Sequence, residues 1–127
     1  MERPPPARNL PIIERLVVAY KLWHGFQIHI PKIPRYSLGI KIDRLFIEVI
    51  ELIFGALQSN SKLAFLELAS RKLETIKFLL QITWGIQALD DKKYLTLSEE
   101  LNEVGRQLGG WLRKTQKENS AQRGAEK

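Results

Sequence analysis

The two histidines, His24 and His29, are the side chains best suited to metal or acid–base chemistry, and their surroundings favour neither. They stand five positions apart, with no carboxylate near them in the sequence. A di-metal site in a helical bundle takes glutamates from two helices and a Glu-x-x-His pair from each of the other two. The chain contains no Glu-x-x-His. We therefore predict no metal site and no cofactor, and place both histidines at helix ends or in connectors.

Nucleophilic catalysis also lacks its usual sequence signs. The chain has no cysteine and no Gly-x-Ser-x-Gly segment, and a phosphate-binding glycine loop should follow a strand. Gly105, Gly109 and Gly110 instead lie inside a helical pattern. The acidic pairs Asp90–Asp91 and Glu99–Glu100 fit a loop and a solvated face. We predict no catalytic residue and no enzyme; stoichiometric bound iron or manganese would revive the enzyme hypothesis.

Positive charge is the remaining chemical feature, and it gathers at the two ends of the chain. The net charge is +6. Residues 1–36 hold six basic and two acidic residues, residues 113–127 hold five and two, and residues 37–112 hold nine and ten. A basic protein attracts polyanions, above all nucleic acids. The alternative is a nearly neutral body with a solubilising basic tail, and charge alone leaves both open.

Most of the charged residues and glycines discussed above fall within four segments whose apolar side chains recur at intervals of three and four. This spacing is typical of amphipathic helices. The segments run from Pro11 to Ile28, from Ser37 or Leu38 to Leu57 or Gln58, from Lys62 to Ala88, and from Lys92 to Thr115. The predicted apolar stripes are Ile13, Leu16, Tyr20 and Trp23; Leu38, Ile42, Leu45, Val49, Leu52 and Ala56; Leu66, Ala69, Leu73, Ile76, Leu80 and Thr83; and Leu97, Leu101, Val104, Leu108 and Trp111. We predict an all-α fold, an antiparallel up-down-up-down four-helix bundle over residues 11–115.

The remaining segments are predicted to lie outside the helices. Residues 1–10 are proline-rich and polar, so we expect a disordered or extended arm. Pro31 and Pro34 indicate a connector over residues 30–37, with Ser37 as the N-cap of the next helix. Residues 116–127 contain no large apolar side chain, which predicts a disordered basic tail. No apolar leader and no membrane-length apolar run is present, so we expect a soluble, cytoplasmic protein without membrane contact.

The glycines of the fourth predicted helix are unusual, because each glycine inside a helix costs roughly 1 kcal/mol relative to alanine. Gly105 and Gly109 share a face, with Gly110 beside them. Two interpretations stay open: close packing within the bundle, or an interface with another subunit. Under either, leucine at Gly109 is expected to overpack a close helix contact. The second half of the third helix, with Phe78 and Ile82, is apolar nearly all round and should be deeply buried or face another subunit.

The segment LNEVGRQLGGWLRK (101–114) carries a family resemblance, supported by IPRYSLGIKI (33–42) and KLETIKFLLQI (72–82). It resembles the small four-helix-bundle proteins that include Avd, the accessory variability determinant of diversity-generating retroelements. Their relatives include proteins encoded within intervening sequences of bacterial 23S ribosomal RNA genes. The similarity covers roughly residues 10–115, and the segment over 101–114 does not separate the two branches.

The resemblance implies a non-catalytic, barrel-shaped homopentamer that binds a reverse transcriptase and template RNA, or an RNA/DNA hybrid, and supports mutagenic cDNA synthesis. By this resemblance Gly105, Gly109, Gly110 and Trp111 become candidates for packing and assembly. Eight helical basic residues become candidates for contacting RNA or the transcriptase: Lys41, Arg44, Arg71, Lys72, Lys77, Arg106, Arg113 and Lys114. For any one of them, a surface ion pair is the alternative. The alternative for the whole chain is an oligomeric interaction bundle like the ribosomal-insert relatives.

Overall fold

The computed structural model describes residues 11–126, apart from the side chains of residues 123, 125 and 126. The predicted arm over residues 1–10 lies outside the described residues. Residues 11–126 contain helices and no strand. The four long helices are α1 (Pro11–Gln27), α3 (Ile40–Gln58), α4 (Lys62–Gly85) and α5 (Asp91–Glu126), and two short elements, α2 (Lys32–Pro34) and the π-helical η2 (Arg35–Gly39), lead directly into α3. The prediction of an all-helical chain is confirmed for this part.

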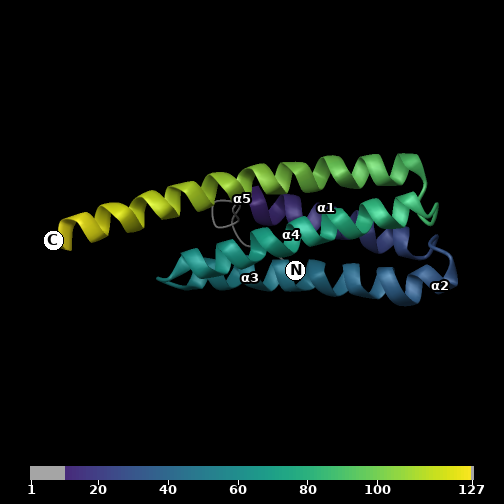
Figure 1. Cartoon of the computed structure of the whole chain (residues 1–127), viewed down its shortest axis with the longest axis horizontal. Helices are drawn as coiled ribbons and strands as arrows, with labels where there is room; N and C mark the ends of the chain where they lie inside the picture. Colours follow the sequence, from purple (N-terminus) through teal and green to yellow (C-terminus); the bar gives the residue numbers. More distant parts are fainter. Residues whose placement is uncertain (1–10, 127) are drawn as a thin grey trace, which may run out of the picture.

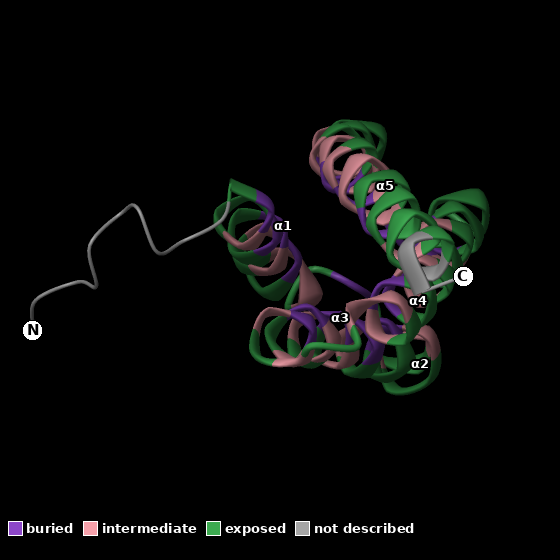
Figure 2. Cartoon of the chain, turned by 90° about the vertical axis from the view of Figure 1, so that its left-hand side faces the viewer, coloured by how far each residue is buried: buried purple, intermediate pink, exposed green. Residues whose placement is uncertain are grey.

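The long helices lie side by side around one apolar core. Helix α1 packs against α3 and α5, and α4 packs against the same two helices. Seen along the bundle, the buried faces point toward a shared centre and the exposed faces point outward (Figure 2). The core therefore joins all four amphipathic stripes.

The core residues follow the predicted stripes most closely in α4. All six of its predicted positions, Leu66 to Thr83, are buried. In α1 the buried face is shifted by one residue at two positions, because Ile12 and Ala19 are buried while Ile13 and Tyr20 are half-buried. In α3 the buried set adds Phe46 and Ile53 and leaves Leu52 half-buried, as is Leu38 in η2. In α5 the stripe is buried from Leu97 to Leu108, with Trp111 half-buried at its edge.

One polar group ties α1 to α3 beside the core. Trp23 is fully buried and stacks on Phe46, with ring centroids 6.2 Å apart. The Trp23 Nε1–H donates to Asp43 Oδ1 at 3.2 Å, and the Tyr20 hydroxyl donates to the same oxygen at 3.0 Å. Burial raises the pKa of the Tyr20 hydroxyl, and the hydrogen bond to Asp43 raises it further. Asp43 thus satisfies the indole donor that packing removes from water.

The predicted connector over residues 30–37 is partly wrong, because helical structure begins at Lys32. Pro34 fits there, since the N–H groups of a first helical turn have no partner to lose. Ser37 is not an N-cap; its hydroxyl donates to the carbonyls of Ile33 and Pro34 at 3.4 Å each. The Arg35 guanidinium donates to the Ile28 and Ile30 carbonyls at 2.8–3.1 Å. Arg35 therefore satisfies carbonyls that the end of α1 leaves open.

The turn between α4 and α5 comes earlier than predicted. Gln87 has a positive φ of 64°, and its N–H bonds to Trp84 while that of Ala88 bonds to Thr83. This is the Schellman pattern, which ends a helix at a left-handed residue. The Asp90 carboxylate then accepts the Lys93 N–H at 2.8 Å. Asp90 thus caps the start of α5.

The C-terminal end also differs from the prediction. Helix α5 continues to Glu126, whereas we expected it to end near Thr115 with a disordered tail. Residues after Thr115 are mostly good helix formers and include no proline, so the helix propagates from the packed part without a new nucleus. Figure 1 shows this stretch projecting beyond the other helices. Among the residues whose side chains are described, Thr115 is the last buried one.

Candidate partner-binding surface

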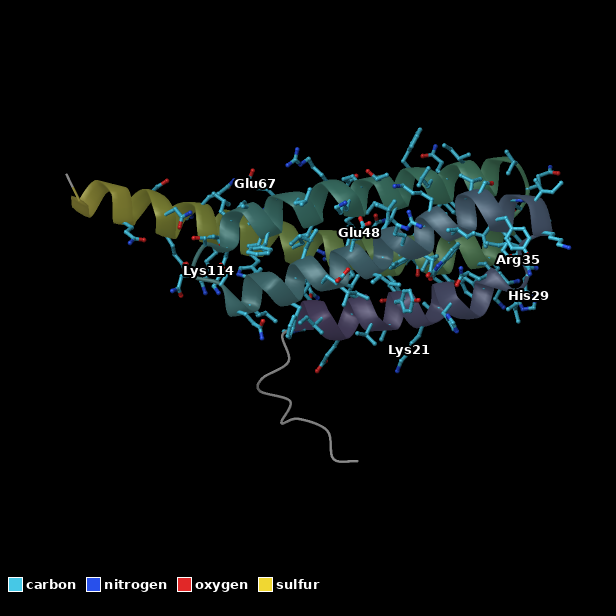
Figure 3. The ribbon with its side chains drawn as sticks, turned by 90° about the horizontal axis from the view of Figure 1, so that it is seen from below. Lys21, His29, Arg35, Glu48, Glu67 and Lys114 are labelled. Carbon is cyan, nitrogen blue, oxygen red and sulfur yellow. The ribbon has the colours of Figure 1, made fainter. Side chains whose placement is uncertain are left out.

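The eight predicted basic residues do not form one patch. Lys41 and Arg44 lie on α3; Arg71, Lys72 and Lys77 lie on α4; Arg106, Arg113 and Lys114 lie on α5. Figure 3 shows Lys114 at the end of the bundle from which α5 projects, Glu48 near the middle, and Arg35 with His29 at the opposite end. The positive charges are thus distributed along the length of the molecule.

One cluster forms across α3 and α4, which we call the Glu48 cluster: Lys41, Arg44, Glu48 and Lys72. Lys72 Nζ lies 2.7 Å from Glu48 Oε2. The hydrogen bond from Lys72 holds the pKa of Glu48 below its usual range, with further lowering from the charges of Lys72, Lys41 and Arg44. Glu51 lines the same stretch of surface. Asp43 lines it as well, so three cations and three carboxylates leave this region without net formal charge.

Two other predicted cations are paired with acids on their own helices. Lys77 Nζ lies 3.2 Å from Glu74 Oε1, and Arg106 pairs with Glu103. Lys72, Lys77 and Arg106 are thus the three predicted residues that form surface ion pairs, as the alternative interpretation expected. Such pairs contribute about 0–1 kcal/mol to stability, so they remain available to exchange partners.

The least compensated predicted cations sit near the end of the packed part of α5. Arg113 and Lys114 are exposed, as is Lys117 one turn further on. No ion pair joins any of the three to another residue of the described chain. We call these three residues the α5 basic ridge. Arg71 is similarly exposed and lines a polar hollow with Asn119 of α5.

Among the described residues, Gly109 and Gly110 make no close helix contact, whereas Gly105 faces α4 closely. A Cβ on Gly109 would meet only the Arg113 guanidinium, at 3.5 Å, and a Cβ on Gly110 would meet the same group at 4.0 Å. At Gly105 the neighbours are the Lys77 ammonium at 3.1 Å and the side chain of Leu73. The expectation that Gly109 packs tightly within the bundle is therefore wrong. The alternative, an interface with another subunit, stays a prediction.

Sequence reasoning missed the glycine with the closest helix contact. A Cβ on Gly55 of α3 would lie 2.7 and 2.9 Å from two ring carbons of Phe65 in α4. The sequence did not predict this contact, because the residues of α3 do not show which side chain of another helix faces Gly55. The only sequence signal is that Gly55 lies near the end of α3 and Phe65 near the start of α4, on either side of the short connection at residues 59–61.

Exposed apolar side chains form two outward stripes. On α3, Ile40, Ile47 and Phe54 recur every seven residues, so they share one outer face. On α4, Phe78 is 60% exposed and Ile82 is 36% exposed. Deep burial of this part of α4, one of the two predicted options, is therefore wrong. The seven-residue spacing in α3 was visible in the sequence but not used.

The ion pair of Glu48 with Lys72 should make the free energy of unfolding depend on pH. Because the folded-state pKa of Glu48 is lowered, its ionised form stabilises the fold above the unfolded pKa, about 4.3, and the contribution disappears as pH falls through the folded value. The pair is roughly one-third exposed, so Glu48→Gln should cost less than about 1 kcal/mol at pH 7. Urea unfolding at several pH values measures it. The cost should shrink as pH falls below the unfolded pKa and disappear once Glu48 is protonated in the folded state as well; a cost independent of pH would contradict the assignment.

Within residues 11–126, no three histidine, aspartate or glutamate side chains come close enough together to hold a metal ion. No helix in the described part of the chain has the length and apolarity needed to cross a membrane.

The described residues are helical, and their most distinctive surface features are exposed basic and apolar side chains. Residues 12–115 match the protein-family model described as bAvd-like. This match covers most of the chain, so the protein belongs to the bAvd-like family. It is an Avd-type accessory protein, and the family as a whole is accessory and non-catalytic. No curated protein sequence matches the chain.

Proposed function

We propose that this chain is the accessory subunit of a diversity-generating retroelement. In this role it binds the element's reverse transcriptase and template RNA, or an RNA/DNA hybrid, and supports mutagenic cDNA synthesis without catalysing a step itself. The observation that carries the proposal is the match over residues 12–115. Exposed cations on α5 without acidic partners in the described chain supply groups for phosphate contacts.

We propose that the working form is a homo-oligomer, a pentamer by resemblance, of antiparallel up-down-up-down bundles. The short connections at residues 59–61 and 86–90 support this topology, because neighbouring helices joined by so few residues run in opposite directions. The outward stripes of α3 and α4, with Phe54 and Phe78 more than half exposed, support self-association. Repetition of the α5 basic ridge around a ring would multiply a modest positive field.

The first test is RNA binding by the purified full chain, titrated across salt with duplex DNA alongside. Each phosphate contact on a single strand contributes about 0.7 to the slope of log affinity against log salt. Removing three contacts should therefore make the slope shallower by about 2. The variant carries alanine at Arg113, Lys114 and Lys117, and the matched control carries alanine at exposed Lys21, Lys32 and Lys92.

Equal slopes for the two variants would exclude the α5 basic ridge as the RNA surface. No RNA binding near 0.15 M salt, the physiological range, and no binding to the transcriptase would contradict the proposed function as a whole.

One observation favours the second candidate, an oligomeric interaction bundle of the ribosomal-insert type. The Glu48 cluster is mixed in sign and the apolar stripes are extensive, which suits protein contacts better than phosphate contacts. This candidate predicts a defined oligomer that ignores both RNA and duplex DNA. The salt titration therefore also separates the two functions.

A further inference from the structure

Helix α3 carries a narrow outward face on which apolar and charged side chains alternate. Its members step by four and three along the sequence, which keeps them on one side of the helix. The apolar members Ile40, Ile47 and Phe54 are 43–55% exposed, and the two charged residues between them are exposed as well. We call this set the α3 outer face: Ile40, Arg44, Ile47, Glu51 and Phe54.

The α3 outer face points away from the rest of the bundle. On one side of it Asp43 accepts hydrogen bonds from α1, and on the other side Glu48 pairs with Lys72 of α4. No ion pair joins Arg44 or Glu51 to another residue of the described chain. An exposed apolar row of this kind, edged by charges, is typical of a surface that another protein covers.

The order of residues on the α3 outer face is self-complementary when the helix is reversed about Ile47. Arg44 lies three residues before Ile47 and Glu51 lies four residues after it, while Ile40 and Phe54 each lie seven residues away. Two copies of α3 packed antiparallel with Ile47 on Ile47 bring Arg44 of each copy opposite Glu51 of the other. The same arrangement brings Ile40 opposite Phe54. A parallel pair would place like charges together, which is unfavourable.

We propose that the α3 outer face is a two-fold contact with a second copy of this chain, in which the two α3 helices pack antiparallel. The apolar rows cover each other over about 21 Å, because Ile40 and Phe54 are fourteen positions apart at 1.5 Å per residue. Two symmetric ion pairs between Arg44 and Glu51 fix the register. Both charged residues and both isoleucines line one hollow of about 400 Å³, which gives the partner's side chains room to enter.

This two-fold contact differs from the contact that closes a ring. A ring joins two different surfaces of neighbouring copies, whereas a two-fold contact joins the same surface of both. It therefore pairs two chains, or two rings, and leaves the outward stripe of α4 for other contacts. It also assigns Arg44, one of the candidates for RNA contact, to a contact between copies. The inference concerns α3 alone and holds whether or not the chain binds RNA.

The first experiment measures the molar mass of the full chain by analytical ultracentrifugation over a range of concentrations. Arg44→Glu leaves only carboxylates on the face and Glu51→Arg leaves only cations, so each variant alone should weaken the contact at least about tenfold. At a concentration where the unaltered chain is paired, each variant should therefore have half its mass. Mixing the two variants in equal amounts should restore the full mass, because opposite charges meet again. The double variant should restore it for the same reason.

The matched control reverses two charges on α1, Glu14 and Lys21, which are also exposed and also seven residues apart. Glu14→Lys and Lys21→Glu should leave the molar mass of the unaltered chain unchanged. Circular dichroism establishes that each variant keeps its helical content.

A cysteine placed on the two-fold axis gives a second measurement that leaves both charges in place. The chain has no cysteine, so Ile47→Cys introduces one thiol per copy. Oxidation should link two copies, because position 47 meets itself and a disulfide needs Cα atoms about 4.4–6.8 Å apart. Ile40→Cys is the control, because its two copies lie about 21 Å apart in the antiparallel pair and should not link.

Four results would overturn the proposal. Single charge variants that keep the full mass would place Arg44 and Glu51 outside any contact. A lowered mass that neither the mixture nor the double variant restores would show that these charges meet a different surface. Equal cross-linking of Ile47→Cys and Ile40→Cys would exclude the two-fold axis at Ile47. An unaltered chain found only as a monomer or an odd-numbered ring would exclude the pairing itself.

Discussion

Replacing Trp23 by alanine is expected to lower the free energy of unfolding by about 3–5 kcal/mol, in the range of large buried aromatic truncations. Trp23 is fully buried, stacks on Phe46, and donates its indole N–H to Asp43. The substitution therefore leaves a cavity and removes one of the two donors that hold the Asp43 carboxylate. Because small domains are stable by about 5–15 kcal/mol, urea denaturation followed by circular dichroism should show a large fall in midpoint.

Trp84→Ala is the matched control for Trp23. Trp84 is 39% exposed, stacks on Tyr94 at 4.7 Å between centroids, and lies at the turn between α4 and α5. Its loss should cost clearly less than the loss of Trp23, because truncation there opens toward solvent. Equal costs at the two positions would show that α1 is not anchored through the Trp23–Phe46 contact.

Gly55→Leu is expected to destabilise the chain by about 1–3 kcal/mol or more through overpacking. Even the Cβ would lie inside contact distance of the Phe65 ring, so α3 and α4 must move apart or the ring must rotate. Thermal or urea unfolding measures the effect. Phe65→Ala should relieve the clash, so the double variant should be less destabilised than the sum of the single variants.

Gly109→Leu serves as the opposite case. Only the mobile end of Arg113 lies near its Cβ position, and leucine is a better helix former than glycine by about 0.8 kcal/mol. The free energy of unfolding of the Gly109→Leu chain should therefore be equal to that of the unaltered chain or slightly higher. A change in molar mass by light scattering at unchanged chain stability would assign the glycine strip to a subunit interface; a loss of stability like that of Gly55→Leu would contradict the geometry.

Much of the fold follows from sequence periodicity, and α4 shows why. Its six buried positions repeat at three and four, and between Ala69 and Ile76 all the intervening residues other than buried Leu73 are polar, so one face satisfies the pattern there. Helix α1 was harder, because Ile12, Ile13 and Ala19 are apolar on adjoining faces. The choice between those faces depends on where α3 and α5 lie, which a single helix does not encode.

The errors come from rules applied without their context. Pro34 was taken as a helix breaker, but it stands in the first turn, where no N–H is required. Residues after Thr115 were taken as disordered because they lack apolar side chains, yet a helix already formed needs only propensity to continue.

The candidate site was less predictable than the fold. The pairing of Lys72 with Glu48 joins residues twenty-four positions apart on two helices, so spacing along one helix does not reveal it. The close contact of Gly55 likewise requires the position of Phe65. Charge counts located the cations of α5 correctly, but only the structure distinguishes the exposed α5 basic ridge from the paired Lys77 and Arg106.

The overhang of α5 divides one continuous helix into two cooperative units. Up to Thr115 the helix unfolds only with the bundle, since its apolar face is part of the core. Beyond Thr115 no described side chain is buried, although Asn119 and Gln122 line a polar hollow with Arg71. Amide exchange there should therefore proceed mainly through local fraying at low free-energy cost. Mutations in that stretch are consequently nearly silent for global stability, and selection on charge and length can act there independently of selection on folding.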